Sequence, residues 1–343
     1  MNHVLRSKIL AFVTRLSMCA LACTSTMHVC AADQRDVGAV EIIVPFGPGG
    51  GADHLARESA KLLGGILAAP VKVTNVVGGT GNVGMAKLIA APNDGNTVAV
   101  LTADTFTLLA YLNPGWKQTD VIPIAIMMKQ PSALFLAENG RFKTWSDFEK
   151  EARLRPETLR VAITGLGSPD YLTLQQMAAR GIKLIPVPLA NPEERYRAPL
   201  DGKADALYEQ LGDVKALVEA KQIRPVLAFS VARLPGFEAV PTSHELGFGD
   251  GFDQFRAIVV RAGTDPEKIK MLSDALEKVA ALPGYKSFLE AEAASSKSYV
   301  PAKNAAAFMQ TELAMMKKIV EALPFHARFI LDAREVETYV EPF

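Results

Sequence analysis

A run of small residues lies between a β-branched segment and a helical pattern near the start of the chain. Gly47, Gly49, Gly50 and Gly51 leave the backbone bare within residues 45–53. Free N–H groups at a helix N-terminus bind an anion without a basic side chain. We therefore predict an anion site here, with Asp53 capping the helix through its side-chain oxygen. The alternative is a tight turn, which would need a single glycine.

Two further glycine-rich loops occupy similar places. Residues 75–84 follow the second predicted strand and open a helix, and residues 164–170 do the same later in the chain. Ligands of open α/β sheets bind beyond the carboxyl ends of the strands. The three loops are therefore predicted to face one shared cleft.

The first loop does not fit the known nucleotide-binding loops. Residues 47–52 match a dinucleotide fingerprint in name, but Pro48 removes a donor and no acidic residue ends the second strand. No Lys-Ser or Lys-Thr pair follows any glycine loop, which argues against a phosphate-binding P-loop. We predict no cofactor.

Residues suited to catalysis or metal binding are scarce. His54, His244 and His326 lack metal-ligand spacing with one another, and the glycines of a nucleophile elbow do not flank Ser168. We predict no catalytic residue and no metal site. A secreted α/β hydrolase with Ser168 as its nucleophile remains the alternative to a binding protein.

The elements that must position these loops alternate between strands and helices, as in a parallel sheet with crossovers. The pattern restarts after Pro131, and a later strand returns to the first lobe. We predict two α/β lobes, with hinges near Ala133 and Phe255: lobe 1 is residues 33–132 and 256–343, and lobe 2 is residues 133–255. The predicted strands are residues 40–44, 71–77, 97–101, 160–163, 184–187, 204–207, 226–229 and 255–261, and the predicted helices include 54–67, 82–91, 266–282 and 301–323.

The N-terminus has the order of a secretory signal peptide. A basic start precedes a short apolar stretch, small residues follow, and no acidic residue occurs before Asp33. We predict cleavage after Ala31 or Ala32, so that residues 1–32 are removed and the protein is periplasmic. All three cysteines fall in this segment, so the mature chain can form no disulfide. The zero formal net charge gives no reason to expect a nucleic-acid partner.

Short motifs in a fixed order give the chain a family resemblance. They are residues 43–53 with Arg57, and 75–84, 91–95, 165–169, 187–188, 202–205, 224–230, Arg233 and 240–247. With these motifs the chain resembles the Bug-type solute receptors of tripartite tricarboxylate transporters. The resemblance implies a type II-like periplasmic binding fold, a small carboxylate ligand in the interlobe cleft, and partnership with the large and small integral-membrane subunits of a transporter.

The resemblance also implies a set of ligand-binding residues. The first two loops would hold one carboxylate mainly through main-chain donors, the third loop would contribute from lobe 2, and Phe46 would form an apolar wall. These residues are Phe46, Gly49, Gly50, Gly51, Ala52, Asp53, Gly81, Asn82, Gly167 and Ser168. We expect a monomer, and a receptor that signals to a membrane sensor is a further alternative to transport.

The far end of the ligand is where the chain departs from the family. Tyr171 and residues 189–191 replace residues common in relatives, and Thr102, Asp104 and Glu209 complete the predicted ligand-binding set. Two acidic residues facing the cleft would repel a second carboxylate and favour a ligand end that donates hydrogen bonds. The alternatives are that Asp104 caps a helix beginning near Thr105, and that Glu209 turns to solvent or pairs with Lys215.

Overall fold

A computed structural model describes residues 38–110 and 112–323, so the predicted signal peptide lies outside the described residues. The strands are β1 Val40–Val44, β2 Val71–Asn75, β3 Thr97–Thr102, β4 Val121–Ala137, β5 Arg160–Ile163, β6 Ile185–Pro188, β7 Ala206–Gln210, β8 Ile223–Phe229, β9 Asp253–Arg261 and β10 Val300–Pro301. The α-helices are α2 Gly51–Leu67, α3 Asn82–Ala90, α4 Ala103–Thr107, α5 Trp145–Leu154, α6 Pro169–Ala178, α7 Pro192–Arg197, α8 Lys215–Glu219, α9 Pro266–Ala281, α10 Pro283–Ala291 and α11 Ala302–Ala322. Short 3-10 turns occur at Gly79–Gly81, Leu108–Ala110 and Gln118–Asp120.

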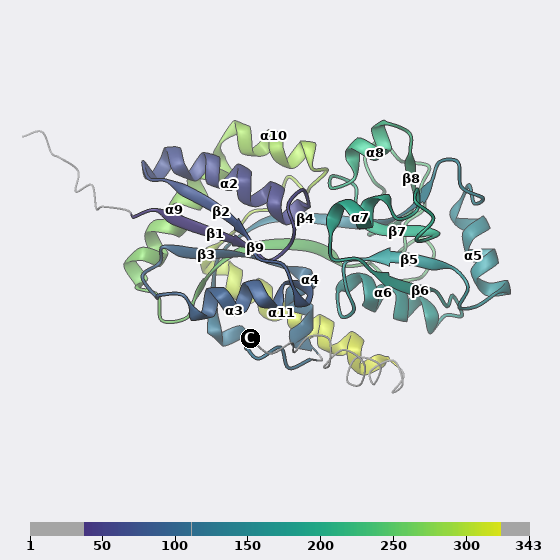
Figure 1. Cartoon of the computed structure of the whole chain (residues 1–343), viewed down its shortest axis with the longest axis horizontal. Coiled ribbons are helices and arrows are strands. Elements are labelled where there is room, and N and C mark those ends of the chain that lie inside the picture. The colour runs from purple at the N-terminus through teal and green to yellow at the C-terminus, as the bar shows by residue number, and fades with distance from the viewer. Residues whose placement is uncertain (1–37, 111, 324–343) are drawn as a thin grey trace, which may run out of the picture. The chain divides into compact units, whose positions relative to one another are not determined.

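Eight strands form one continuous path in the order β2-β1-β3-β9-β4-β7-β5-β6, and β8 and β10 each pair with β4 off this path. β1 pairs in parallel with β2 and β3, and β5 pairs in parallel with β6 and β7. β9 and β4 run antiparallel to their neighbours and join the two parallel groups (Figure 1). The predicted α/β class is confirmed, with a mixed sheet in which the parallel strands flank an antiparallel centre.

The long strand β4 was not predicted from the sequence. Its first part pairs with β9 up to Pro131, and its second part, from Ser132, pairs with β7 and β8. Pro123 lies next to a register shift, where a strand tolerates a residue that donates no hydrogen bond. The change of partner falls beside the predicted boundary near Ala133, and the lobe boundaries themselves stay a prediction.

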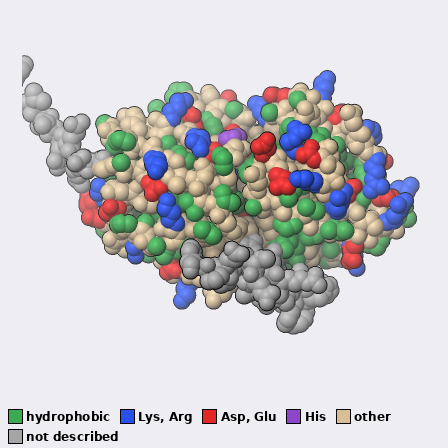
Figure 2. Space-filling view, viewed as in Figure 1, with side chains coloured by type: hydrophobic (Ala, Val, Ile, Leu, Met, Phe, Trp, Pro, Cys, Tyr) green, Lys and Arg blue, Asp and Glu red, His purple; other side chains and the backbone are tan. Residues whose placement is uncertain are grey.

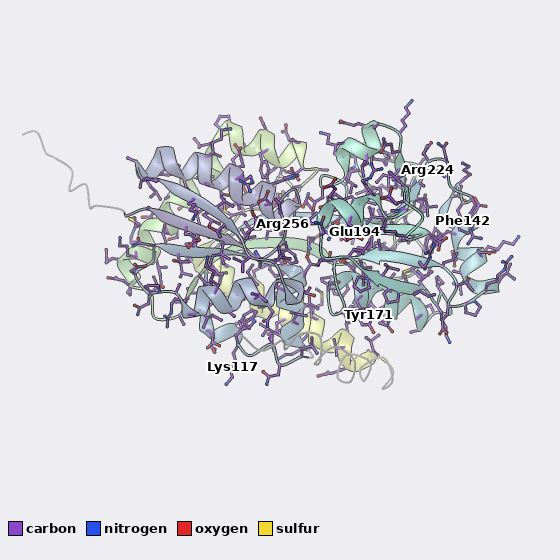
Figure 3. The ribbon with its side chains drawn as sticks, in the orientation of Figure 1. Lys117, Phe142, Tyr171, Glu194, Arg224 and Arg256 are labelled. Carbon is purple, nitrogen blue, oxygen red and sulfur yellow. The ribbon has the colours of Figure 1, made fainter. Side chains whose placement is uncertain are left out.

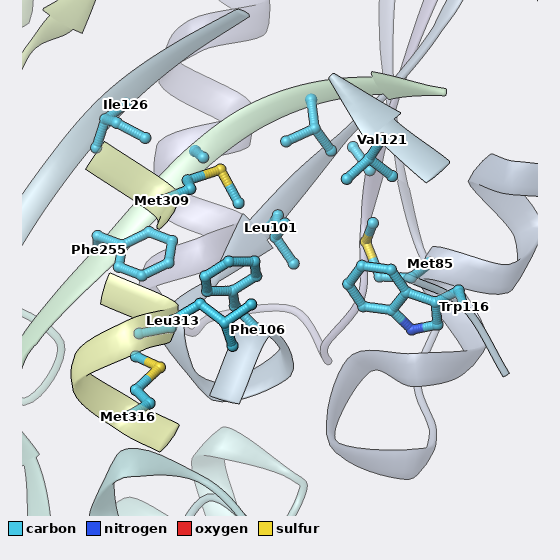
Figure 4. Packing of buried hydrophobic residues seen from close by; sticks show 14 of the residues in the cluster. Met85, Leu101, Phe106, Trp116, Val121, Ile126, Phe255, Met309, Leu313 and Met316 are labelled. Atoms are coloured by element: carbon cyan, nitrogen blue, oxygen red, sulfur yellow. The ribbon is translucent and has the colours of Figure 1, made fainter. Parts of the chain in front are cut away.

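Helices cover both faces of the strands in each half. In the first half, α2 packs against α9 on one face, while α3 and α11 lie on the other (Figure 1). The core on the α11 side gathers Met85, Phe106, Phe255, Met309 and Met316 (Figure 4). In the second half, one core contains residues of α5 and α6 and another contains residues of α7 and α8. Each half therefore has its own packed core, as a lobe requires.

The C-terminal helical region differs from the prediction by one helix. Residues 266–282 and 301–323 were predicted as helices, and α9 and α11 occupy those places. A further helix, α10, begins at Pro283 directly after Leu282 leaves the helical conformation. Proline at the first position of a helix is favourable, which accounts for the new start.

Candidate functional site

The first glycine loop connects β1 to α2 and ends where α2 begins. Gly50 is the N-cap residue of α2 and makes no side-chain cap, so the prediction that Asp53 caps the helix is wrong. The helix starts at Gly51, three residues earlier than predicted, and Asp53 is its third residue. Its carboxylate accepts from Gly49 N at 3.1 Å, Arg57 Nε at 2.8 Å and Asn75 Nδ2 at 2.9 Å. Asp53 is therefore a bracing residue behind the loop.

The second glycine loop lies beside the first. Asn75 donates to both Phe46 O, at 3.0 Å, and Asp53, which ties the two loops together. Gly81 has φ +91°, and an added Cβ would lie 2.1 Å from Thr105 Oγ1 and 3.2 Å from Phe46 Cζ. Asn82 Oδ1 accepts from Trp116 Nε1 at 2.7 Å. This loop thus supports Phe46 from behind.

The third glycine loop opens α6 in the second half. Ser168 is the N-cap of α6: its hydroxyl accepts from Tyr171 N at 3.3 Å and donates to Gly165 O at 2.8 Å. Ser168 is fully buried. A Cβ on Gly165 would lie 2.4 Å from Thr80 Oγ1, so this loop packs directly against the second loop. Gly167 has φ +90°, which explains a glycine there.

A small cavity lies where the two halves meet. Its volume is about 30 Å³, enough for one or two water molecules. Of the predicted set, Phe46, Gly50, Gly51, Ala52, Thr102, Asp104 and Glu209 line it. The lining does not include Gly49, Asp53, Gly81, Asn82, Gly167 or Ser168. The residues that sequence reasoning missed are Thr164, Pro192, Arg195, Gln210, Asp213, Gln254 and Arg256.

Two buried arginines give the cavity its charge pattern. Arg195 Nε lies 2.9 Å from Glu209 Oε2, and Arg256 Nη2 lies 2.7 Å from Asp213 Oδ2. All four side chains are at most 6% exposed. Glu209 is thus neither unpaired, nor turned to solvent, nor paired with Lys215, and those alternatives are wrong. Burial raises the pKa of Glu209 to about 7 against the lowering effect of Arg195.

The anion site predicted at α2 already holds a carboxylate of the chain itself. Asp213, from the turn between β7 and α8, accepts from Gly51 N at 3.2 Å as well as from Arg256. A Cβ on Gly51 would lie 2.1 Å from Arg256 Nη2 and 2.4 Å from Asp213 Oδ1. Because Gly51 has no Cβ, the Asp213–Arg256 ion pair can lie directly against the N-terminus of α2. Arg256 lies at the junction of the two halves (Figure 3).

Asp104 is buried in the cavity wall. Thr102 is the N-cap of α4 and accepts from Thr105 N, so the alternative in which Asp104 caps that helix is wrong. The hydroxyl of Thr102 can reach the N–H three residues on, whereas Asp104 lies inside the helix. Asp104 Oδ2 accepts from Gln254, and burial raises the pKa of Asp104 well above the usual value, with Asp170 and Glu209 adding to the effect.

Some sequence signal for the missed residues existed. Arg256 is a charged residue inside the apolar run of β9, and a buried strand keeps such a residue only where it has a partner. Arg195 follows the departure at residues 189–191, and its partner Glu209 lies on β7. Asp213 lies in a turn, where an acidic residue is common and gives no signal.

Metal-binding geometry is absent from this site. Among residues 38–110 and 112–323, no group of three or more His, Cys, Asp and Glu side chains could hold a metal ion. Two of the acids that line the cavity are instead held in ion pairs with arginines.

In the part of the chain that the structure describes, no helix is both long and apolar enough to span a membrane.

The fold matches that of the periplasmic binding protein BugD, with a TM-score of 0.77 at 19% identity, which confirms the predicted two-lobed binding-protein fold. Residues 55–325 match the model of the tripartite tricarboxylate transporter family receptor, TctC, so the chain belongs to that family. It is 27% identical over 249 residues to protein BugT of Bordetella pertussis, covering 71% of this chain and 76% of BugT. The resemblance to Bug-type receptors is thereby confirmed.

Solved structures show the same fold. Malate-bound MatC of Rhodopseudomonas palustris has a TM-score of 0.76 at 20% identity, covering 83% of this chain and 99% of MatC. An R. palustris protein with adipate has a TM-score of 0.78 at 23% identity, covering 84% and 97% of the two chains.

Proposed function

We propose that this chain is a periplasmic solute receptor that holds a small organic carboxylate between its two lobes and delivers it to the integral-membrane subunits of a tripartite tricarboxylate-type transporter. The observation that carries the proposal is the cavity between the halves, which brings the N-terminus of α2 and two buried arginines together. Malate and adipate in the two solved relatives support a carboxylate as the ligand class.

The α2 terminus supplies the chemistry for one carboxylate. Gly51 N and Arg256 Nη2 converge on a single carboxylate oxygen, the one that Asp213 now provides. The backbone N–H groups at the N-terminus of the 17-residue helix α2 favour an anion, and so does the guanidinium of Arg256. A ligand carboxylate would bind the same donors once Asp213 moves away with its lobe.

The secreted-enzyme alternative loses its nucleophile in this arrangement. Ser168 uses its hydroxyl to cap α6 and to donate to Gly165 O, and it does not line the cavity. Binding without turnover is the proposed activity. The surface fits a soluble receptor, because positive and negative side chains are interspersed over the face shown in Figure 2.

A thermal-shift screen of the mature protein against mono-, di- and tricarboxylates, aromatic acids and amino acids tests the proposal. A ligand at about 100 times its Kd stabilises the folded state by about 2.7 kcal/mol, which raises the melting temperature measurably. Mass spectrometry of the incubated ligand should show it unchanged. If no acid raises the melting temperature, or if the best ligand is consumed, the chain is not the receptor proposed here.

A further inference from the structure

The cavity wall contains polar atoms that have no hydrogen-bond partner among the described residues. Asp104 Oδ1, Gln254 Oε1 and Asp213 Oδ1 are acceptors, and Arg256 Nε is a donor. All four belong to residues that line the cavity, and each residue is at least nine-tenths buried. Buried polar atoms are rarely left unpaired, so these atoms point to a ligand. Because acceptors predominate, that ligand must bring donors.

Of the three acids that line the cavity, the ion pairs leave Asp104 without a cation. Arg195 is committed to Glu209, and Arg256 is committed to Asp213. Asp104 has only the Gln254 amide, which is neutral. Asp170 lies buried at the first turn of α6 and adds negative potential at Asp104. The Asp104 side of the cavity therefore favours positive charge.

A structural role for Asp104 alone does not account for this arrangement. Thr102 caps α4, so the helix does not need Asp104. Asp104 is only 4% exposed, so solvent does not satisfy its free oxygen. A second ligand carboxylate here would meet the acceptor atoms of Asp104 and Gln254, which have no cation of their own, in a poorly hydrated site where repulsion is weakly screened.

We propose that Asp104 and Gln254 form a subsite for a cationic nitrogen, so that the native ligand is an amine-bearing carboxylate. An ammonium group has three donors and no acceptor, which matches Asp104 Oδ1 and Gln254 Oε1. The inference rests on the proposed function, which places the ligand carboxylate at the other side of the cavity, at Gly51 and Arg256. The proposed ligand thus has a negative charge at one end and a positive charge at the other.

Two series of probes of equal chain length test the subsite by isothermal titration calorimetry. The six-carbon series is adipate, ε-aminocaproate and hexamethylenediamine, and the four-carbon series is succinate, γ-aminobutyrate and putrescine. We expect the amino acid of at least one series to bind about tenfold more tightly than its dicarboxylate, because a charged hydrogen bond replaces a repulsion.

Each other outcome has a distinct meaning. Tighter binding of the dicarboxylate overturns the amine subsite and leaves the carboxylate receptor intact. Tighter binding of the diamine keeps the amine subsite and overturns the carboxylate clamp. If no probe binds, the amine subsite is overturned, and the broad acid screen then decides whether the receptor function fails as well.

The variant Asp104→Asn tests the residue itself. It keeps the size of the side chain and removes the charge, so we expect the preference for the amino acid over the dicarboxylate to fall about tenfold. The control Asp201→Asn makes the same change of charge at an exposed acid after α7 and should leave the preference unchanged. An unchanged preference in a folded Asp104→Asn variant would rule the subsite out.

Proton linkage gives a second readout. Burial, with Asp170 on α6 and Glu209 on β7, raises the pKa of Asp104, while Arg195 on α7 and Gln254 on β9 lower it. A bound ammonium also lowers this pKa, so binding should release a proton from Asp104. Calorimetry in phosphate and in Tris should then give different binding enthalpies for the wild type and a smaller difference for Asp104→Asn. Equal differences in the two proteins would contradict the proposal.

Discussion

Asp213 and Arg256 occupy the place where a ligand carboxylate is expected. Asp213 Oδ2 has two donors, Gly51 N and Arg256 Nη2, whereas Asp213 Oδ1 has none. Burial raises the pKa of Asp213, with Glu292 adding to the effect, while Arg256 lowers it. The pair is thus only half satisfied, and a ligand carboxylate competes with Asp213 for the same donors.

The substitution Asp213→Asn should therefore tighten carboxylate binding. An amide is a weaker acceptor than a carboxylate at a charged site, so we expect the Kd for adipate or ε-aminocaproate to fall about tenfold. The ligand-free variant should be less stable by about 3–5 kcal/mol, because Arg256 loses its counter-charge. Calorimetry and urea unfolding measure the two effects. Weaker binding in a folded variant would show that Asp213 does not compete with the ligand carboxylate and instead helps to hold the site together. The control is Asp274→Asn, which changes an exposed acid on α9.

The individual residues show which part of the site the sequence could predict. Gly50 and Gly51 were predicted because consecutive glycines before a helix leave a local signal, whereas Phe46 and Ala52 were predicted from the family resemblance. Arg195, Arg256 and Asp213 were missed because each acts through an ion pair with a distant residue. Arg195 pairs with Glu209, 14 positions away, and Arg256 pairs with Asp213, 43 positions away. A single sequence does not reveal which charges meet after folding.

The glycine loops depend on bracing by elements behind them. Asp53 in the first turn of α2 and Asn75 at the end of β2 bond to each other and to the loop that carries Phe46. Arg57, one turn further along α2, holds the other side of Asp53. This arrangement fixes the start of α2 against β2 and so fixes the donors of the proposed carboxylate site.

Asp53→Asn should loosen this bracing. Removing charged hydrogen bonds to a buried carboxylate should lower the free energy of unfolding by about 1–3 kcal/mol at neutral pH. Although burial opposes it, hydrogen bonds from Arg57, Asn75 and Gly49 hold the pKa of Asp53 below the ordinary 3.8. The stabilisation is therefore present above the unfolded-state pKa and is lost as the pH falls through the folded-state pKa.

Urea unfolding at a series of pH values checks the prediction for Asp53. The free energies of unfolding of the wild type and the variant should differ most at neutral pH and should converge as the pH falls below about 4. A difference that stays constant across this range would show that Asp53 acts through shape and not through charge.

At the scale of elements, the sequence predicted most strands and helices but not their joining. Periodicity is local, so residues 40–44 and 160–163 were predicted with the bounds that β1 and β5 have. β4 was missed because Pro123 and Pro131 interrupt its pattern, and tertiary pairing with β9, β7 and β8 overrides that signal. β4, the strand that connects the two halves, therefore had the weakest signal in the sequence.

In the molecule as a whole, glycines allow the halves to approach closely. Gly165 meets Thr80, Gly50 meets Pro192 at 3.1 Å from an added Cβ, and Gly212 meets the backbone of Glu292. In the predicted division each of these contacts joins one lobe to the other. The cavity between the halves is too small for an acid of several carbon atoms, so the proposed function requires the halves to open for ligand entry.

Gly212→Ala should hold the lobes apart. A Cβ on Gly212 would lie 2.0 Å from Glu292 O and 2.4 Å from Glu292 C, and backbone atoms cannot turn away as a flexible side chain can. Relief requires the turn before α8 to lift from the end of α10, which also removes Asp213 from Gly51. We expect a larger radius of gyration by small-angle scattering than in the ligand-free wild type. Gly284→Ala is the matched control, since an added Cβ there meets nothing within 4 Å. Identical scattering curves for Gly212→Ala and the wild type would show that the turn can shift alone, and that this contact does not set the interlobe angle.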